Sequence, residues 1–334
     1  YDDENASPSN ASSPKLICGE EESAGHTHTE ECVCPGGELI CGKDESEGHT
    51  HGEDCYAKGG ELICDLEETS FYASDSDIEV TTAEELKAAF DAAETGDIVT
   101  LGADIAYDQS TLKTITVSKD ITLDCNGYKI SVDDALFEIA ETGDLTLVNA
   151  QIEATDEDII DTIRAGGALT IVSTFGGGIV TNDDFIEDNY GKVYIKDGTF
   201  RLGYSVVYEC YGTAEVIIEN ADMETKGCVI GYLEDAGCSL YIKNGSYTVE
   251  NYIVSGTYGQ ILIEAGTFQS IEDCFDSIYS GTVTIKGGNF TAGNTENEYY
   301  CFDIYKNSDQ PSATVNIDGG TFASTSNTCL LYTS

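Results

Sequence analysis

The sequence predicts an all-β fold, a parallel β-helix solenoid whose coils of about 23 residues stack on one another. The first observation is a pattern of about ten residues that recurs along the chain, in which apolar residues alternate with others before a charged residue, a glycine and an aromatic residue. The second is the regular spacing of its copies, and the third is a charge whose sign alternates from copy to copy. Clear copies begin at Gly191, Gln260 and Gly281.

The second apolar position of the pattern marks each coil. Its copies recur about every 23 residues: Leu123, Leu147, Ile171, Ile195, Ile218, Ile242, Ile263, Ile285 and Ile317. The next position forms a charge ladder: Lys196, Glu219, Lys243, Glu264, Lys286 and Asp318. In-register parallel strands lie about 4.8 Å apart. In one register of the coils opposite charges of this ladder face each other and attract, whereas a slip of one coil would place like charges side by side. The ladder therefore predicts how the coils stack.

Each coil also supplies residues for an interior. Five positions after the marker stand large apolar residues, which we expect to stack inside: Phe200, Met223, Tyr247, Phe268, Phe290 and Phe322. A glycine or alanine two positions earlier suits a corner with positive φ. Apolar pairs such as Val206-Val207 precede the marker, so each coil has two or three strands. Six cysteines are expected as small core residues, and Cys274 and Cys301 are expected to stack, with or without a bridge.

A helix is predicted before the first strand, 98–101. Thr82 and Glu85 form a capping box, and Gly96 stands where a helix-ending glycine belongs. One apolar face is predicted: Leu86, Ala89, Phe90 and Ala93. Because the open end of a solenoid exposes strand edges and core, we expect this helix to be the N-terminal cap.

Composition divides the chain into a disordered leader (1–15), a Cys/His module (16–65), a linker (66–78) and the β-helix (79–334). The first residue is Tyr1, and the end from Cys329 resembles the translation of a transposon end used in sequencing libraries, so we expect a fragment cut inside the β-helix. The net charge of −47 argues against binding to nucleic acids or anionic membranes. No apolar run is long enough for a transmembrane helix, so we expect no membrane insertion in this fragment.

The Cys/His module contains all four histidines of the chain in two matching units. The units supply eight candidate zinc ligands: Cys18, His26, His28, Cys32, Cys41, His49, His51 and Cys55. Two thiols and two imidazoles make a tetrahedral zinc set. The alternative is disulfides, either Cys18–Cys32 with Cys41–Cys55, or Cys32–Cys41 with Cys55–Cys64.

Carboxylates recur on the strand that precedes the marker, and these are the candidate catalytic residues: Glu138, Asp161, Glu187 and Glu209. Neighbours in such a column would lie near the roughly 5 Å separation of a retaining glycosidase. The register drifts by one or two residues here, so a solvated face is the alternative. Acidic turns are candidate calcium ligands: Asp133-Asp134, Glu157-Asp158, Asp183-Asp184 and Glu272-Asp273.

An outward column beside the marker becomes apolar over four coils, at Tyr194, Ile217, Tyr241 and Leu262. Contiguous apolar surface often marks an interaction site, and tyrosine faces can stack on sugars. The alternative is packing by a neighbouring loop, or scattered β-propensity. This column is the candidate binding surface.

Two resemblances add a setting. The predicted cap and the segment Ile121-Thr-Leu-Asp-Cys-Asn-Gly-Tyr128 resemble the opening of pectate-lyase-like right-handed β-helices of bacterial surface proteins. The Leu-x-Cys-Gly…His-x-His-x3-Cys units resemble repeats of Gram-positive surface proteins. These resemblances imply a right-handed coil, secretion and attachment at the bacterial cell wall.

The function class follows from what the β-helix contains. It has no histidine, so the Gly-His-Gly of polygalacturonases is absent, and Arg164 and Arg201 are its only arginines for lyase chemistry. We therefore expect non-catalytic adhesion or carbohydrate binding, with a glycan or a host or cell-surface protein as partner. The alternative is a polysaccharide-active hydrolase or lyase of the same fold.

Overall fold

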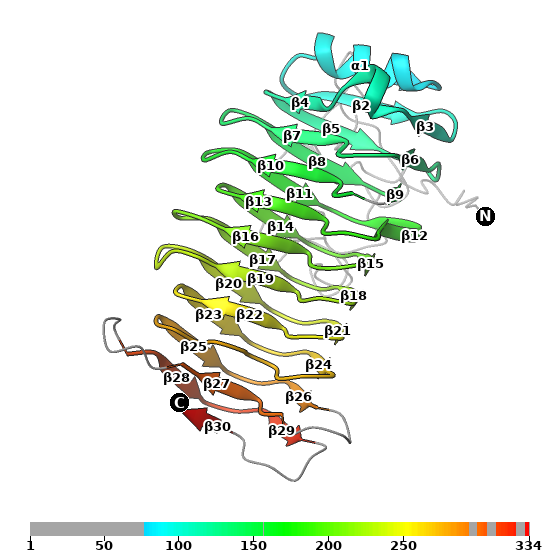
Figure 1. Cartoon of the computed structure of the whole chain (residues 1–334). Helices are drawn as coiled ribbons and strands as arrows, with labels where there is room; N and C mark the ends of the chain where they lie inside the picture. Colours follow the sequence, from blue (N-terminus) through cyan, green and yellow to red (C-terminus); the bar gives the residue numbers. More distant parts are fainter. Residues whose placement is uncertain (1–76, 156, 294–298, 306–311, 325–330, 334) are drawn as a thin grey trace, which may run out of the picture. The chain divides into compact units, whose positions relative to one another are not determined.

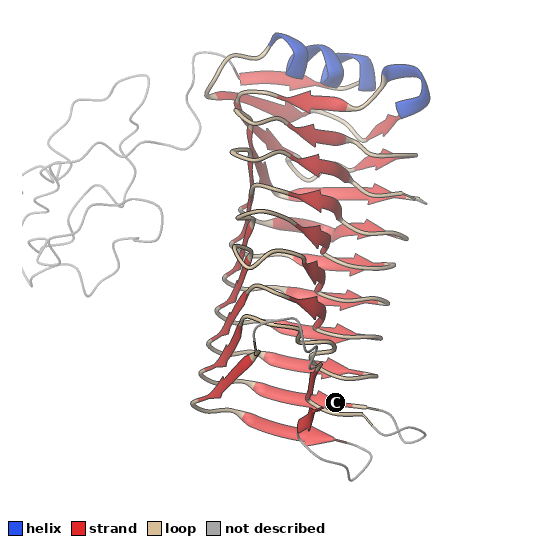
Figure 2. Ribbon diagram, turned by 60° about the vertical axis from the view of Figure 1, so that its left-hand side comes forward, coloured by secondary structure: helices blue, strands red, loops and turns tan. Residues whose placement is uncertain are grey.

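The computed structural model describes residues 77–155, 157–293, 299–305, 312–324 and 331–333. The chain divides into two units, Tyr1–Asp77 and Ile78–Ser334. The second unit is a parallel β-solenoid of about nine turns, with coils of about 24 residues (Figures 1 and 2). The predicted fold class is confirmed.

Three sheets run along the solenoid, and we call them sheets 1, 2 and 3. Sheet 1 consists of β1 (Asp77–Val80), β2 (Asp97–Leu101), β5 (Asp120–Asp124), β8 (Asp144–Val148), β11 (Ala168–Ile171), β14 (Lys192–Ile195), β17 (Glu215–Ile218), β20 (Ser239–Ile242), β23 (Gln260–Ile263), β25 (Thr282–Ile285) and β28 (Thr314–Ile317). Sheet 2 consists of β4 (Ile115–Val117), β7 (Phe137–Ile139), β10 (Ile160–Ile163), β13 (Ile186–Asn189), β16 (Val207–Cys210), β19 (Ile230–Leu233) and β22 (Val254–Thr257).

Sheet 3 completes each coil. It consists of β3 (Ile105–Tyr107), β6 (Ile130–Val132), β9 (Ala150–Ala154), β12 (Thr174–Thr181), β15 (Thr199–Leu202), β18 (Asp222–Thr225), β21 (Ser246–Val249), β24 (Thr267–Ser270), β26 (Asn289–Ala292) and β29 (Thr321–Ser324). Isolated parallel bridges at Phe275 extend sheet 2 from β22 to β27 (Phe302–Ile304), which pairs with β30 (Leu331–Thr333).

The coils stack in the register that the charge ladder predicts. Ile218 lies opposite Ile195 on one side and Ile242 on the other. The ladder closes ion pairs from Lys243 to Glu219 and from Lys286 to Glu264, the latter at 3.0 Å between Nζ and Oε1. Such partly exposed pairs each contribute at most about 1 kcal/mol, so they select the register more than they stabilise the fold.

The predicted interior stack is confirmed. The ring of Phe268 lies between those of Tyr247 and Phe290, with centroids 4.7 and 4.6 Å away, and all three side chains are buried. Gly266 has φ of +127°, and a Cβ there would lie 2.9 Å from the Phe268 ring, so the corner requires glycine. The six cysteines among the described residues are buried free thiols, as expected of small core residues.

The N-terminal cap is helix α1 (Ala83–Ala92), which packs Phe90 against Phe137 at 5.5 Å. Thr82 Oγ1 accepts a hydrogen bond from the Glu85 amide at 3.2 Å, while Glu85 accepts the amide of Thr81 at 2.8 Å. A short helix, α2 (Gln109–Leu112), follows β3. Figure 2 shows both helices at the end of the solenoid, where they cover the first coils.

The assignment of Gly96 as the helix-ending glycine is wrong. The helix ends at Ala92, and Ala93 is its C-cap with φ of −54°. Gly96 lies three residues farther on, with φ of +93°, and its amide donates to the Asp120 carbonyl at 2.8 Å. Its positive φ therefore serves the turn into β2, where the chain leaves the cap and joins sheet 1.

Candidate functional site

The structure places the predicted site residues on different parts of the molecule. The eight Cys and His residues predicted as zinc ligands lie outside the described residues. The candidate catalytic carboxylates all lie in sheet 2: Glu138 in β7, Asp161 in β10, Glu187 in β13 and Glu209 in β16. The candidate binding column lies in sheet 1.

The carboxylates of sheet 2 form two outward columns. In β13 both ends, Ile186 and Asn189, are buried, whereas both middle residues, Glu187 and Asp188, are partly exposed. Pairing between β13 and β16 sets Asp188 opposite Glu209. Glu209 therefore lies beside Asp188 rather than beside Glu187, because β13 and β16 each turn two consecutive residues outward.

Sheet 2 carries an excess of negative charge. Its seven described strands contain five carboxylates and no lysine or arginine: Glu138, Asp161, Glu187, Asp188 and Glu209. Arg164, just after β10, bonds Glu138 with 2.7 Å between Nη2 and Oε1. Burial, and then the charge of Asp188, raises the pKa of Glu187. Burial, and then the charge of Glu209, raises the pKa of Asp188.

A row of tyrosines runs along the edge where the chain leaves sheet 2. We call it the tyrosine row: Tyr190, Tyr211, Tyr258, Tyr279 and Tyr305. The rings of Tyr190 and Tyr211 stack with centroids 4.8 Å apart, and those of Tyr258 and Tyr279 stack at 5.0 Å. Glu234 takes the intervening place, since its amide bonds the carbonyl of Cys210 at 2.9 Å.

Backbone pairing holds the tyrosine row in line. The amide of Tyr190 donates to the carbonyl of Ile163 at 2.8 Å, and that of Tyr211 donates to the carbonyl of Asn189 at 2.9 Å. The backbone of each tyrosine is thus hydrogen-bonded to the preceding coil. We did not predict this row from the sequence. The available signal is a Tyr-Gly dipeptide that recurs at 190, 211 and 258, always just before a sheet 1 strand.

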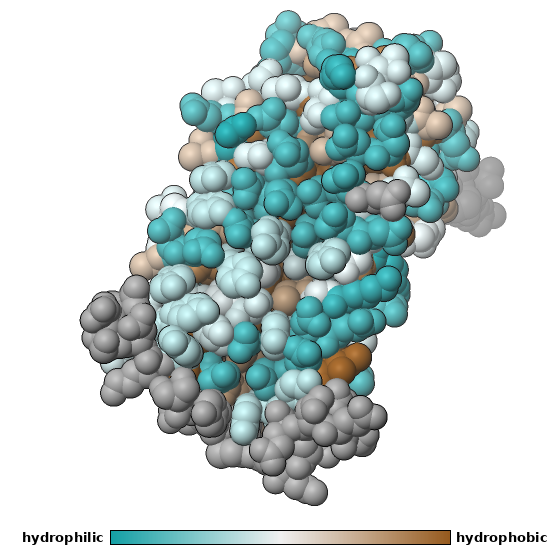
Figure 3. Space-filling model, viewed as in Figure 1, coloured by the Kyte–Doolittle hydropathy of each residue, from teal (hydrophilic) through white to brown (hydrophobic). Residues whose placement is uncertain are grey.

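Further tyrosines lie on sheet 2 itself. Tyr208 in β16 and Tyr232 in β19 meet edge to face with centroids 6.0 Å apart, and Tyr208 is 37% exposed. The hydroxyl of Tyr211 donates a hydrogen bond to the Glu209 carboxylate. We call these tyrosines, the tyrosine row and the outward carboxylates the sheet 2 face. Figure 3 shows mainly hydrophilic and intermediate side chains over β13, β16 and β19.

The candidate binding column is contiguous. Tyr194, Ile217, Tyr241 and Leu262 lie directly opposite one another in β14, β17, β20 and β23, and all four are partly exposed. Lysines lie over both tyrosine rings: Lys196 Nζ is 5.7 Å from the Tyr194 centroid and Lys243 Nζ is 5.8 Å from that of Tyr241. Cation–π contact thus already occupies part of these ring faces.

Three of the four predicted acidic turns contribute to carboxylate clusters. The groups are Asp158, Asp183 and Asp184, and Asp273, Asp276 and Asp303, each with carboxylate oxygens within 4.8 Å of one another. The fourth turn does not, since Asp133 accepts the amide of Gln109 at 2.7 Å.

In the first cluster, burial and like-charge repulsion disfavour the ionised carboxylates. Burial, and then the charge of Glu187, raises the pKa of Asp158 to about 8, and burial raises that of Asp184 to about 7. Oδ1 of Asp158 is buried without a hydrogen-bond partner. Calcium is coordinated by carboxylate oxygens, so Asp158, Asp183 and Asp184 offer ligands of the type that this ion requires.

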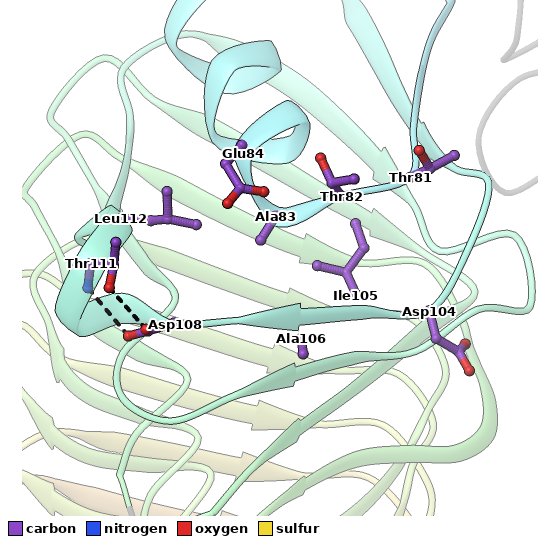
Figure 4. Close-up of a pocket in the computed structure, with 10 residues that line it drawn as sticks. All are labelled: Thr81, Thr82, Ala83, Glu84, Asp104, Ile105, Ala106, Asp108, Thr111 and Leu112. Carbon is purple, nitrogen blue, oxygen red and sulfur yellow. Dashed lines mark hydrogen bonds between the residues drawn. The ribbon is translucent and has the colours of Figure 1, made fainter.

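Pockets lie elsewhere. One of about 280 Å³ lies between the cap and the first coil, where Asp108 bonds Thr111 and caps α2 (Figure 4). Two of its polar side chains, Thr82 and Asp108, therefore cap the N-termini of α1 and α2. A second, of about 480 Å³, follows the edge of sheet 3 beside Arg201, Lys226 and Ile271. Neither is lined by the sheet 2 face.

The sequence matches no protein-family model, and no curated protein is significantly similar to it. Within the described part of the chain, no helix combines the length and the apolar character needed to cross a membrane.

Proposed function

We propose that the β-helix is a non-catalytic carbohydrate-binding module of a secreted bacterial cell-surface protein, and that it serves adhesion. The observation that carries the proposal is the tyrosine row beside the carboxylates of sheet 2. From Tyr190 to Tyr305 the row covers five coil steps of about 4.8 Å, or roughly 24 Å. An extended polymer lying along the solenoid would meet a tyrosine of the row in five of these six coils and Glu234 in the remaining one.

The chemistry of the sheet 2 face suits sugars. A tyrosine offers a flat apolar face and a polar tip, and carboxylates accept hydrogen bonds from hydroxyl groups. Stacking on a neighbouring ring already orders Tyr190 and Tyr211, so little side-chain entropy remains to be lost on binding. Solenoids commonly use such extended surfaces for binding.

The test is binding of the intact chain to a glycan array, followed by affinity electrophoresis in gels that contain the hits. Changing Tyr190 and Tyr211 together to alanine should weaken binding at least about tenfold, because a stacked ring contributes on the order of 1–3 kcal/mol. The matched control is the pair Tyr194 and Tyr241 on sheet 1. If the control pair loses binding and the sheet 2 pair retains it, the glycan lies on sheet 1 instead.

The second candidate is a glycoside hydrolase on the same face. The observation that favours it is the buried carboxyl group of Asp158, whose pKa burial, and then the charge of nearby Glu187, raises to about 8. A hydrolase needs one protonated and one ionised carboxyl group. Release of reducing ends from a bound glycan, abolished by Glu187→Gln while binding persists, would establish the enzyme and refute the non-catalytic proposal.

A further inference from the structure

Resting on the proposed function, we infer that the glycan bound by the sheet 2 face is a polymer with free amino sugars. The sugar rings lie on the tyrosine row, and the ammonium groups lie among the outward carboxylates. This assigns a ligand class, a polycationic polysaccharide, rather than a neutral or uronate polymer.

Sheets 1 and 2 differ in how their charges are paired. On sheet 1 the ladder pairs Glu219 with Lys243 and Glu264 with Lys286. The seven strands of sheet 2 contain five carboxylates and no basic residue. Arg164, just after β10, bonds Glu138, and its charge partly offsets the rise in the pKa of Asp188, but one guanidinium leaves the five carboxylates with a net negative charge. Like charges on directly opposed residues destabilise a sheet, so sheet 2 retains a negative field that a bound cation would relieve.

A carboxylate repeatedly lies two residues before a ring of the tyrosine row. Asp188 precedes Tyr190 by two residues, Glu209 precedes Tyr211, and Asp303 precedes Tyr305. Asp188 and Glu209 lie opposite each other on adjacent strands, while Tyr190 and Tyr211 stack at the ends of those same strands. A sugar ring on this stack thus has its substituents next to two carboxylates.

The sheet 2 face should bind polymers of its own negative charge weakly. A uronate polymer would bring further negative charge to carboxylates that already repel one another. The charge of Glu209 raises the pKa of Asp188, and that of Asp188 raises the pKa of Glu187. A basic protein would satisfy the charge but would not need stacked, partly exposed rings. Only a ligand with both cations and apolar ring faces uses the whole sheet 2 face.

The experiment compares three probes with the intact chain by isothermal titration calorimetry at low salt and mildly acidic pH. The probes are glucosamine oligomers, N-acetylglucosamine oligomers of the same length, and oligogalacturonates. We expect the glucosamine oligomers to bind at least about tenfold more tightly than the acetylated ones, since several ion pairs of a few tenths of a kcal/mol add up. Oligogalacturonates should bind most weakly.

Variants locate the effect. Asp188→Asn with Glu209→Gln should remove the preference for the amine, so that the glucosamine and N-acetylglucosamine oligomers bind this variant with similar affinity. The control is Glu250→Gln, an exposed acid outside sheet 2 that lines the sheet 3 groove, which should keep the preference. Circular dichroism checks that each variant is folded.

The outcomes separate the two proposals. Equal affinity for the aminated and acetylated oligomers would refute the amino-sugar inference and leave glycan binding standing. No binding to any glycan would refute the proposed function itself. Poly-L-lysine that binds as tightly as the glucosamine oligomers, with no loss in the variant that lacks Tyr190 and Tyr211, would show a merely electrostatic surface and refute the inference.

Discussion

The hydroxyl of Tyr211 donates its hydrogen bond to the carboxylate of Glu209, two residues earlier in the same coil. That hydrogen bond, and then burial, raises the pKa of Tyr211 well above its ordinary value, so the hydroxyl stays protonated. The bond links the outward carboxylate column to the tyrosine row. It fixes the angle of one ring of the Tyr190–Tyr211 stack.

Tyr211→Phe should therefore weaken glycan binding less than Tyr211→Ala. Phenylalanine keeps the ring face but loses the bond to Glu209, so we expect a loss of about two- to fivefold, the worth of one ordinary hydrogen bond. Alanine loses the ring and should cost about tenfold or more. Affinity electrophoresis measures both. Equal losses would mean that the ring contributes nothing by stacking.

The carboxylate cluster at Asp158 predicts a pH dependence of stability. Its raised pKa means that the folded state binds this proton more tightly than the unfolded state does. The resulting stability is present in full below the ordinary aspartate pKa and is lost as the pH rises through about 8. Asp184, with a pKa of about 7, acts in the same direction. The temperature of the unfolding midpoint should therefore decrease as the pH is raised from 4 to 8.

Asp158→Asn isolates this contribution from the repulsion of the whole acidic surface. The variant removes the titrating group but keeps its shape, so its unfolding midpoint should change less between pH 4 and pH 8. It should also be more stable than the natural chain at pH 8. Differential scanning calorimetry measures both. A variant that is as pH-sensitive as the natural chain would assign the effect to other groups.

Calcium should act on the same cluster. A divalent cation held by Asp158, Asp183 and Asp184 would favour their ionised forms, so calcium should raise the unfolding midpoint by several degrees at pH 8 and less at pH 5. Asp183→Asn should reduce the gain, whereas Asp133→Asn, in the acidic turn outside both clusters, should not. If chelator-treated protein gains nothing from millimolar calcium at pH 8, the acidic turns are not calcium sites.

The Cys/His module predicts zinc. Protein purified under reducing conditions should contain about one zinc per complete unit, and thus two per chain, since each unit offers two thiols and two imidazoles. Metal analysis by mass spectrometry measures this, and His26→Ala with His28→Ala should halve it. If protein purified without reductant is free of zinc, and its module cysteines resist thiol labelling until they are reduced, the disulfide alternative is favoured.

The sequence by itself determined the architecture because every coil repeats the same local chemistry. The marker residues, the alternation from Lys196 to Asp318 and the stack from Phe200 to Phe322 are all readable as columns. Each column fails if the register slips by one residue, since a slip turns the core side chains outward. The columns on sheets 1 and 3 agree with one another in only one register, and that register defines how the coils stack.

Sheet 2 was decided only by the tertiary structure. Strands β13 and β16 each turn two consecutive residues outward, so the spacing of Glu187 and Glu209 did not show that Glu209 lies opposite Asp188. The tyrosine row was hidden for a related reason, since Tyr190 and Tyr211 are aligned by backbone pairing across coils of unequal length. A column can be read from spacing where coil lengths repeat. Where they drift, only the hydrogen bonds between coils decide which side chains meet.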